Sequence, residues 1–152
     1  MHPRRRAREV ALQVLYALDV LKNDPDQAIE LFWKNFDAPE ESREFSSALI
    51  LGAWSHRDRL DNHIIGCSEH WAIHRMPRVD RSILRIAIYE LFYCPDIPPK
   101  VTINEAIDLG KIYGSENSSS FINGILDAVY LKLRSDHADN NLDHPDRQST
   151  VP

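Results

Sequence analysis

The chain has 152 residues, of which 43% are hydrophobic, 27% are charged, 5 are glycine and 2 are cysteine. This length suits one domain with a sizeable core, and the composition argues against a β protein and a disulfide scaffold. The net charge of −5 divides into +4 for residues 1–8, −7 for residues 9–133 and −2 for residues 134–152. A basic start on an acidic body indicates an anionic and a basic partner, although an acidic surface that only maintains solubility explains the body equally well.

Residues 1–21 combine basic residues with an apolar run, as a secretory signal does. However, Glu9, Gln13 and Asp19 interrupt the run, and its apolar residues recur on one helical face. We therefore expect a folded first helix from about Arg5 to Leu21. No stretch is long enough to span a membrane, and we expect a cytoplasmic protein.

Three further helices are expected before residue 74. Asp24 as N-cap with Pro25 at the first helical position starts one, and Pro39 starts the next with glutamates in or near its first turn. A fourth begins near Arg57 and extends to Trp71. Residues 74–77 read as a break, which separates an N-terminal half from three C-terminal helices.

The C-terminal helices have the clearest pattern. Residues 79–91 are apolar around most of the helical circumference, which is typical of a central, buried helix. Thr102 and Glu105 have the spacing of a capping box for the next helix, although Val101 or a proline is an equally good start. Gly114 suits a left-handed C-cap.

The last helix begins at Ser115 or Ser118, because either hydroxyl can cap it. After Arg134 apolar residues nearly disappear, so residues 135–152 are expected to be a disordered polar tail. The sequence thus predicts an all-α domain at residues 1–134, with about six or seven helices in two packed groups.

Four segments, in this order, are similar to the NusB family of bacterial transcription antitermination factors: RRRARE at 4–9, ILRIAIYEL at 83–91, KVTINEAIDLGKIYG at 100–114 and FINGILD at 121–127. The region from about residue 23 to 76 resembles the family in its helical pattern alone. The resemblance implies two helical subbundles, with the first helix lying close to both.

The basic arm, residues 1–8, carries the most specific functional signal: Arg4, Arg5, Arg6 and Arg8. Positive charge opposes the dipole at a helix start, and in the neighbouring sequence only Glu9 offsets it. An RNA phosphate backbone would offset this repulsion. The residues alone fit a solvated basic tail at least as well, and the family resemblance decides for RNA. With three or four phosphates neutralised, log K should fall against log salt with a slope of roughly −2 to −3.

Tyr16 follows Arg8 by a little over two helical turns, so both can share a face. An exposed tyrosine there would stack on an unpaired base, whereas the pattern fits a half-buried core tyrosine equally well; the resemblance implies RNA contact. The family also places RNA near the start of the last helix, which gives Asn117, Ser118 and Phe121 as candidates. Asn117 stands where an acid is common, and serines replace basic residues, so this contact is expected to be weaker. The pattern alone favours a core role for Phe121.

Asp80 matches an acidic position that the family uses toward NusE, a small-subunit ribosomal protein; a favourable charge in a first helical turn is the simpler explanation. The resemblance implies a heterodimer with NusE that binds boxA RNA. This pair would join the RNA polymerase elongation complex through other Nus factors and support ribosomal RNA transcription. Some family members form a homodimer instead.

Histidines raise a metal alternative, because His56, His63 and His70 recur every seven residues and His70 and His74 are four apart. The segment lacks the glutamate of a zincin, and no P-loop, nucleophile elbow or dinucleotide fingerprint is present. We therefore expect no metal, no cofactor and no catalytic residue, that is, no enzyme.

Two alternatives to RNA binding with NusE remain. A helical protein–protein adaptor would need neither RNA nor the arginines. A NusB-like domain also precedes the catalytic domain of RNA cytosine methyltransferases, but these 152 residues leave no room for such a domain, so we expect a stand-alone factor.

Overall fold

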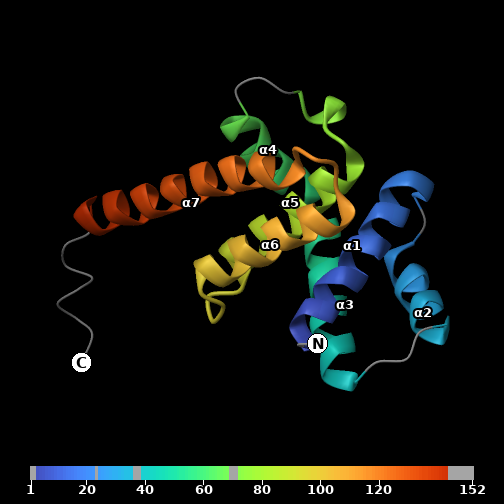
Figure 1. Ribbon diagram of the computed structural model, residues 1–152. Helices are drawn as coiled ribbons and strands as arrows, with labels where there is room; N and C mark the ends of the chain where they lie inside the picture. Colours follow the sequence, from blue (N-terminus) through green and yellow to red (C-terminus); the bar gives the residue numbers. More distant parts are fainter. Residues whose placement is uncertain (1–2, 23, 36–38, 69–71, 144–152) are drawn as a thin grey trace, which may run out of the picture.

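The computed structural model of the protein describes residues 3–22, 24–35, 39–68 and 72–143, without the side chains of 137–143. Within these ranges every regular element is helical (Figure 1), and no helix is long and apolar enough to cross a membrane. The elements are α1 Pro3–Leu21, α2 Pro25–Asn35, α3 Glu40–Ser55, α4 Arg57–Cys67, the 3-10 helix η1 Ile73–Arg75, α5 Arg78–Tyr93, α6 Pro99–Tyr113 and α7 Ser118–Asp143. The predicted all-α fold with six or seven helices is confirmed.

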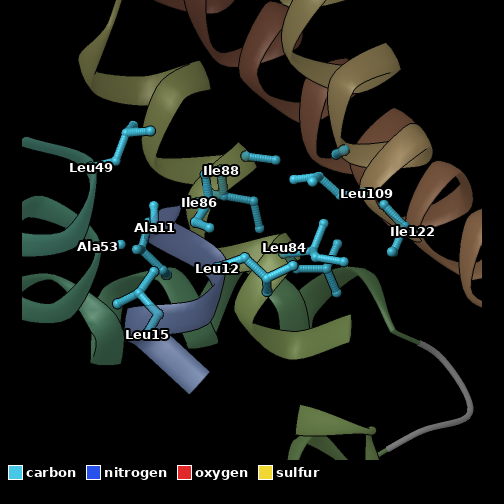
Figure 2. Close-up of a cluster of buried hydrophobic side chains, with 14 of the residues drawn as sticks. Ala11, Leu12, Leu15, Leu49, Ala53, Leu84, Ile86, Ile88, Leu109 and Ile122 are labelled. Atoms are coloured by element: carbon cyan, nitrogen blue, oxygen red, sulfur yellow. The ribbon is translucent and has the colours of Figure 1, made fainter. Parts of the chain in front are cut away.

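Helix α5 is central, because it packs against α1, α3, α4, α6 and α7. Its residues Ile83, Leu84 and Ile88 are fully buried. Figure 2 shows α1 and α3 meeting this core from one side, and Leu109 of α6 and Ile122 of α7 from the other. Helices α1–α3 form one group and α5–α7 the other, and α1 contacts both. Helix α4, which the predicted break assigned to the N-terminal half, packs against α5 and α7 as well as α3.

Two buried serines fasten α1 to α3. The Ser46 hydroxyl donates to the carbonyl oxygen of Ala7 at 2.9 Å, and the Ser42 hydroxyl donates to that of Pro3 at 3.3 Å. Small hydroxyl side chains let the two helices approach closely and still satisfy their own polar atoms. The first turn of α1, which begins at Pro3 rather than Arg5, is therefore held against α3.

Two helix starts test the predicted caps. Asp24 caps α2 as predicted, since its Oδ1 accepts a bond from the amide of Asp26 at 3.2 Å. The capping box at Thr102 is wrong: α6 begins at Pro99, the alternative that the sequence left open. A proline fits there because the first helical turn does not use its N–H groups. Thr102 lies inside α6, and its hydroxyl donates to Glu90 Oε1 at 3.1 Å.

Gly114 provides space rather than a left-handed turn. Its φ is −92°, so the predicted left-handed C-cap is wrong. A Cβ at this position would collide with the Ser118 side chain. The Ser118 Oγ accepts a hydrogen bond from the amide of Ser115 at 2.8 Å. Ser118 is the first residue of α7, so its hydroxyl bonds back to the preceding loop rather than capping the helix from the residue before it.

Helix α7 continues past Arg134 to Asp143, so the first part of the predicted tail is helical. Extending an existing helix adds one hydrogen bond per residue and needs no further nucleation, so a helix can continue into a segment that lacks apolar periodicity. Helix α4 ends at Cys67, and Ser68 is extended, so the predicted extension of this helix to Trp71 is wrong. Residues 144–152, His70 and Trp71 lie outside the described residues. Disorder of the tail stays a prediction.

Candidate nucleic-acid and partner interface

The four predicted arginines belong to α1 itself and differ widely in exposure. The exposed fraction of the side chain is 41% for Arg4, 38% for Arg5, 38% for Arg6 and 4% for Arg8. Their positions in the first two turns spread them around the helix. The structure brings the arginines together at one end of α1 but does not present them as one exposed face.

Arg8 is buried in an ion pair with Glu90 of α5. Its Nε donates to Glu90 Oε2 at 2.9 Å and its Nη2 donates to Oε1 at 2.7 Å, a bidentate geometry. Glu90 is itself almost fully buried and also accepts the Thr102 hydroxyl. The structure therefore argues against the predicted phosphate contact of Arg8, because its guanidinium is buried and already hydrogen-bonded to the Glu90 carboxylate.

Arg5 reaches α6. Its Nε and Nη2 donate to the carboxylate of Glu105 at 3.0 and 3.1 Å, and Nη2 also donates to Asp108 Oδ2 at 2.7 Å. The hydrogen bond and charge of Glu105 raise the pKa of Arg5 above its ordinary value. This guanidinium is held on the protein, at the edge of solvent.

Arg4 and Arg6 are held more loosely. Arg4 lies 3.7 Å from Asp96 and packs over the ring of Phe45, with 4.7 Å between its Cζ and the ring centroid. Arg6 lies 3.9 Å from Glu9. Arg4 and Asp96 are both exposed, and such a pair contributes about 0–1 kcal/mol, so a phosphate can replace Asp96 at modest cost. Glu9 is buried and also accepts the Tyr113 hydroxyl, so only the Arg6 side of the second pair is open to solvent.

Glu9 is not the main offset for the arginine charge, and the sequence-based expectation on this point is wrong. Glu90, Glu105 and Asp108 lie far along the chain and are brought to the start of α1 by α5 and α6. The positive charge at the start of α1 is thus balanced by carboxylates of the protein itself, without a bound anion. The case for RNA at this end rests on the half-exposed Arg4 and Arg6.

Tyr16 is 42% exposed, which favours the stacking role over the core role that the sequence left open. It lines a shallow hollow of about 310 Å³ with Leu12, Gln13, Val79 and Tyr113. The Tyr113 hydroxyl donates to Glu9 Oε2 at 2.5 Å, and this bond raises the pKa of Tyr113. An apolar hollow beside an exposed ring can accept a flat, unpaired base.

Asp80 and Ser118 bind each other. The Ser118 hydroxyl donates to Asp80 Oδ1 at 2.7 Å, and both residues are buried, with 3% of Asp80 exposed. Burial raises the pKa of Asp80, and the Ser118 bond opposes that rise. The predicted direct contacts of Ser118 with RNA and of Asp80 with a partner are therefore restricted, because these groups face inward and fix the start of α7 to α5.

Asn117 and Phe121 stand beside this pair. Asn117 is exposed and Phe121 is half-buried. Together with Asp80 they line a pocket of about 260 Å³, whose other lining residues are Met76, Pro77 and Ser115. Val79, next to Asp80, lines the Tyr16 hollow, so the two hollows are neighbours. The structure thus joins Tyr16, Asn117, Phe121 and Asp80 in one region.

A second ion-pair cluster, which the sequence did not indicate, ties the end of α1 to α4 and α5. Arg81 Nη2 donates to Asp19 Oδ2 at 2.8 Å. Arg85 donates to both carboxylate oxygens of Asp61 at 2.7 Å and lies 3.6 Å from Asp19. One signal was available for such pairs: charged residues inside an apolar helix, such as Arg85 and Glu90, require buried partners.

The histidines do not assemble a metal site in the described part of the chain. No group of three or more His, Cys, Asp or Glu side chains with suitable spacing occurs there. His56 and His63 instead pack on aromatic rings, of Tyr93 and Phe92 respectively, with centroids 4.6 and 4.5 Å apart.

Comparison with known proteins gives a consistent result. The model of the NusB family matches residues 5–131. The transcription antitermination protein NusB of Syntrophus aciditrophicus (strain SB) is 58% identical over 149 residues, which cover 98% of this chain and 92% of the relative.

Solved structures agree with the fold. The NusB of T. maritima superposes with a TM-score of 0.76 at 35% identity, covering 84% of this chain and 90% of that one. A structure of the antitermination factors NusB and NusE in complex with double-stranded RNA superposes with a TM-score of 0.77 at 29% identity, covering 87% of this chain and 98% of that one.

Proposed function

The chain belongs to the NusB family, and on that premise we propose that it is a transcription antitermination factor. It binds boxA-type single-stranded RNA together with NusE and supports processive transcription of ribosomal RNA operons. The observation that carries this is the 58% identity to an antitermination protein over nearly the whole chain. The structure of NusB with NusE and double-stranded RNA, at 29% identity, supports NusE and RNA as the classes of partner.

The RNA face runs from the start of α1 to the start of α7. Arg4 and Arg6 bind phosphates, because both guanidinium side chains are half-exposed at the start of α1. Tyr16 stacks on a base, and Asn117 and Phe121 hold a further nucleotide at their shared pocket.

Three of the predicted residues act less directly in this proposal. Arg5 adds long-range attraction while bound to Glu105 and Asp108. Arg8 fixes α1 to α5 through Glu90, and Ser118 fixes the pocket through Asp80. These last two are positioning residues, and their replacement changes RNA binding by moving the exposed groups.

NusE meets the acidic body near Asp80, whose buried carboxylate shapes the start of α5 and α7 for the partner. Residues 1–134 supply the binding domain, and the tail beyond it is dispensable for folding. Work in the RNA polymerase elongation complex, through other Nus factors, places the protein in the cytoplasm. The activity is binding, and no residue performs a chemical step.

A helical adaptor or homodimer without direct RNA binding is the second candidate. One observation favours it: the most strongly held arginines, Arg5 and Arg8, already have protein partners. An adaptor predicts that replacing the arginines leaves RNA binding unchanged.

Fluorescence anisotropy of a labelled boxA-type RNA, with and without NusE, tests the proposal. We expect sequence-dependent binding that strengthens with NusE, and weaker binding for the Arg4→Ala/Arg6→Ala variant. A scrambled RNA and the Lys34→Ala variant, an exposed charge change on α2, are the controls. No binding by the folded protein in either condition would leave the adaptor or the homodimer.

A further inference from the structure

A groove lies where α4 meets the end of α5, outside the RNA face described above. Its volume is about 400 Å³, and it is lined by Arg59, Leu60, His63, Phe92 and Tyr93. We call it the aromatic groove. Nothing in the proposed function uses these side chains.

The rings of the aromatic groove are fixed in place and partly exposed. His63 stacks on Phe92 with centroids 4.5 Å apart and an interplanar angle of 25°. Tyr93 stacks on Tyr89 at 5.0 Å, and its hydroxyl accepts a bond from Arg59 Nη1 at 3.0 Å. The ring centroid of His56 also lies 4.6 Å from that of Tyr93, so these rings are rigidly held, and the parts of them that remain exposed can accept a flat ligand with little loss of side-chain freedom.

The groove has positive charge at its edge, although the body of the protein is acidic. Arg59 is exposed there, and the charge of Lys132 on α7 reaches His63. Burial lowers the pKa of His63, and the charges of Arg59 and Lys132 lower it further, while Asp136 opposes them. An exposed arginine beside stacked rings, with the charge of a lysine within range, is complementary to a polyanion that carries aromatic bases.

The groove also adjoins the arginine end of α1. Glu90, which holds Arg8, lies one helical turn before Tyr93. Asp96, just after α5, lies 3.7 Å from Arg4. A strand bound at the arginines therefore reaches the groove by crossing the end of α5.

We propose that the aromatic groove is a second contact for single-stranded RNA, which takes unpaired nucleotides that flank the segment held by α1. Bases stack on Phe92, Tyr93 and His63, and Arg59 and Lys132 bind phosphates. A proline-rich peptide would also use aromatic rings, but it would not need the two cations. This inference rests on the proposed function, because the strand arrives from the arginine end.

The test compares a boxA-type RNA with the same RNA extended by about six unpaired nucleotides at either end, a length within the range that one single-strand site covers. Anisotropy with the full chain should show about fivefold or tighter binding for one extended RNA, as expected for at least one stacked base. Tyr93→Ala and Arg59→Ala should remove this gain and leave affinity for the short RNA unchanged. Tyr93→Phe, which keeps the ring, and Lys34→Ala are the matched controls.

Photo-crosslinking from 4-thiouridine in the extension gives a second readout and should label the α5 end or α4. Equal affinity for the short and extended RNAs overturns this inference and leaves the proposed function intact, whereas failure of every RNA to bind overturns both. A gain that survives Tyr93→Ala and Arg59→Ala, or a proline-rich peptide that binds while the extension adds nothing, overturns it as well.

Discussion

The two ends of α1 are both tied to α5 by ion pairs, but with opposite charges. At the first end α1 supplies arginines, and α5 and α6 supply carboxylates such as Glu90 and Glu105. At the other end α1 supplies Asp19, and α5 supplies Arg81 and Arg85. Each arrangement opposes the dipole of α1, so neither would be favourable in an isolated helix.

The difference between the ends lies in what remains accessible. Arg81, Arg85 and Asp19 are largely shielded, and they bind one another and Asp61. One exposed arginine, Arg78, also lies against Asp19 at this end.

The first end keeps Arg4, Arg5 and Arg6 partly exposed beyond its buried pair, and Arg5 is bound to Glu105 and Asp108. In the proposed function, the same kind of interaction would serve stability at one end, and stability together with RNA recognition at the other. Four measurements test this distinction.

Replacement of Arg8 should have the largest effect. Arg8→Ala leaves Glu90 buried without its counter-charge, and breaking a buried pair from one side costs about 3–5 kcal/mol. Urea unfolding measures this loss. Lys34→Ala should stay within about 0.5 kcal/mol of the parent. A similar small loss for Arg8→Ala would show that the pair is not buried in solution.

Replacement of Asp19 should lower the free energy of unfolding by less than replacement of Arg8 does, and should not change RNA binding. Asp19→Asn keeps the size but weakens the charged bonds to Arg81 and Arg85, so we expect about 1–3 kcal/mol in the free energy of unfolding. The affinity for boxA-type RNA should not change at a temperature where the variant is folded. Weaker RNA binding by the folded variant would contradict the purely structural role of this end.

The Arg4→Ala/Arg6→Ala variant should bind RNA more weakly but keep nearly the same free energy of unfolding. Each change should alter stability by at most about 0.5 kcal/mol. The slope of log K against log salt should become shallower by about 0.7 for each phosphate of the single strand that the variant no longer neutralises. An unchanged salt slope would remove these two arginines from the RNA face.

The smallest effect concerns pH. Burial raises the pKa of Asp80, so the folded state holds this proton to a higher pH than the unfolded chain. The stabilisation it contributes is present below the ordinary carboxyl pKa and is lost as pH rises through the raised value. Asp80→Asn removes this component, and its stability relative to the parent should therefore improve from acid to neutral pH. Urea unfolding across that range checks it; parallel curves would contradict it.

Local pattern was sufficient for most of the fold. Apolar periodicity predicted the central helix at 79–91, and an aspartate before a proline located the start of α2. The errors arose where local signals compete: Thr102 and Glu105 had capping-box spacing but bind Glu90 and Arg5 instead. Similarly, Gly114 is required because a Cβ there would collide with the Ser118 side chain, and not because the chain makes a left-handed turn.

The candidate site was less predictable because its geometry depends on contacts between distant segments. Nothing near Arg5 in the sequence indicates Asp108, which is brought to it by the packing of α6 on α5 and α1. The arginine cluster and Tyr16 were found from residue type and the family resemblance. Which of these side chains are exposed is a tertiary property, and it separates Arg4 and Arg6 from Arg8.

The serines of α3 that bond to the backbone of α1 have a thermodynamic consequence. Because Ser42 and Ser46 hold the carbonyls of Pro3 and Ala7, the arginine-bearing turn is ordered before RNA arrives. Arginine-rich segments that fold on contact show a large negative heat-capacity change and lose chain entropy on binding. Here the RNA would meet a preformed surface, so calorimetry should record a small heat-capacity change, and encounter would be governed by diffusion and electrostatic attraction rather than by folding of the protein.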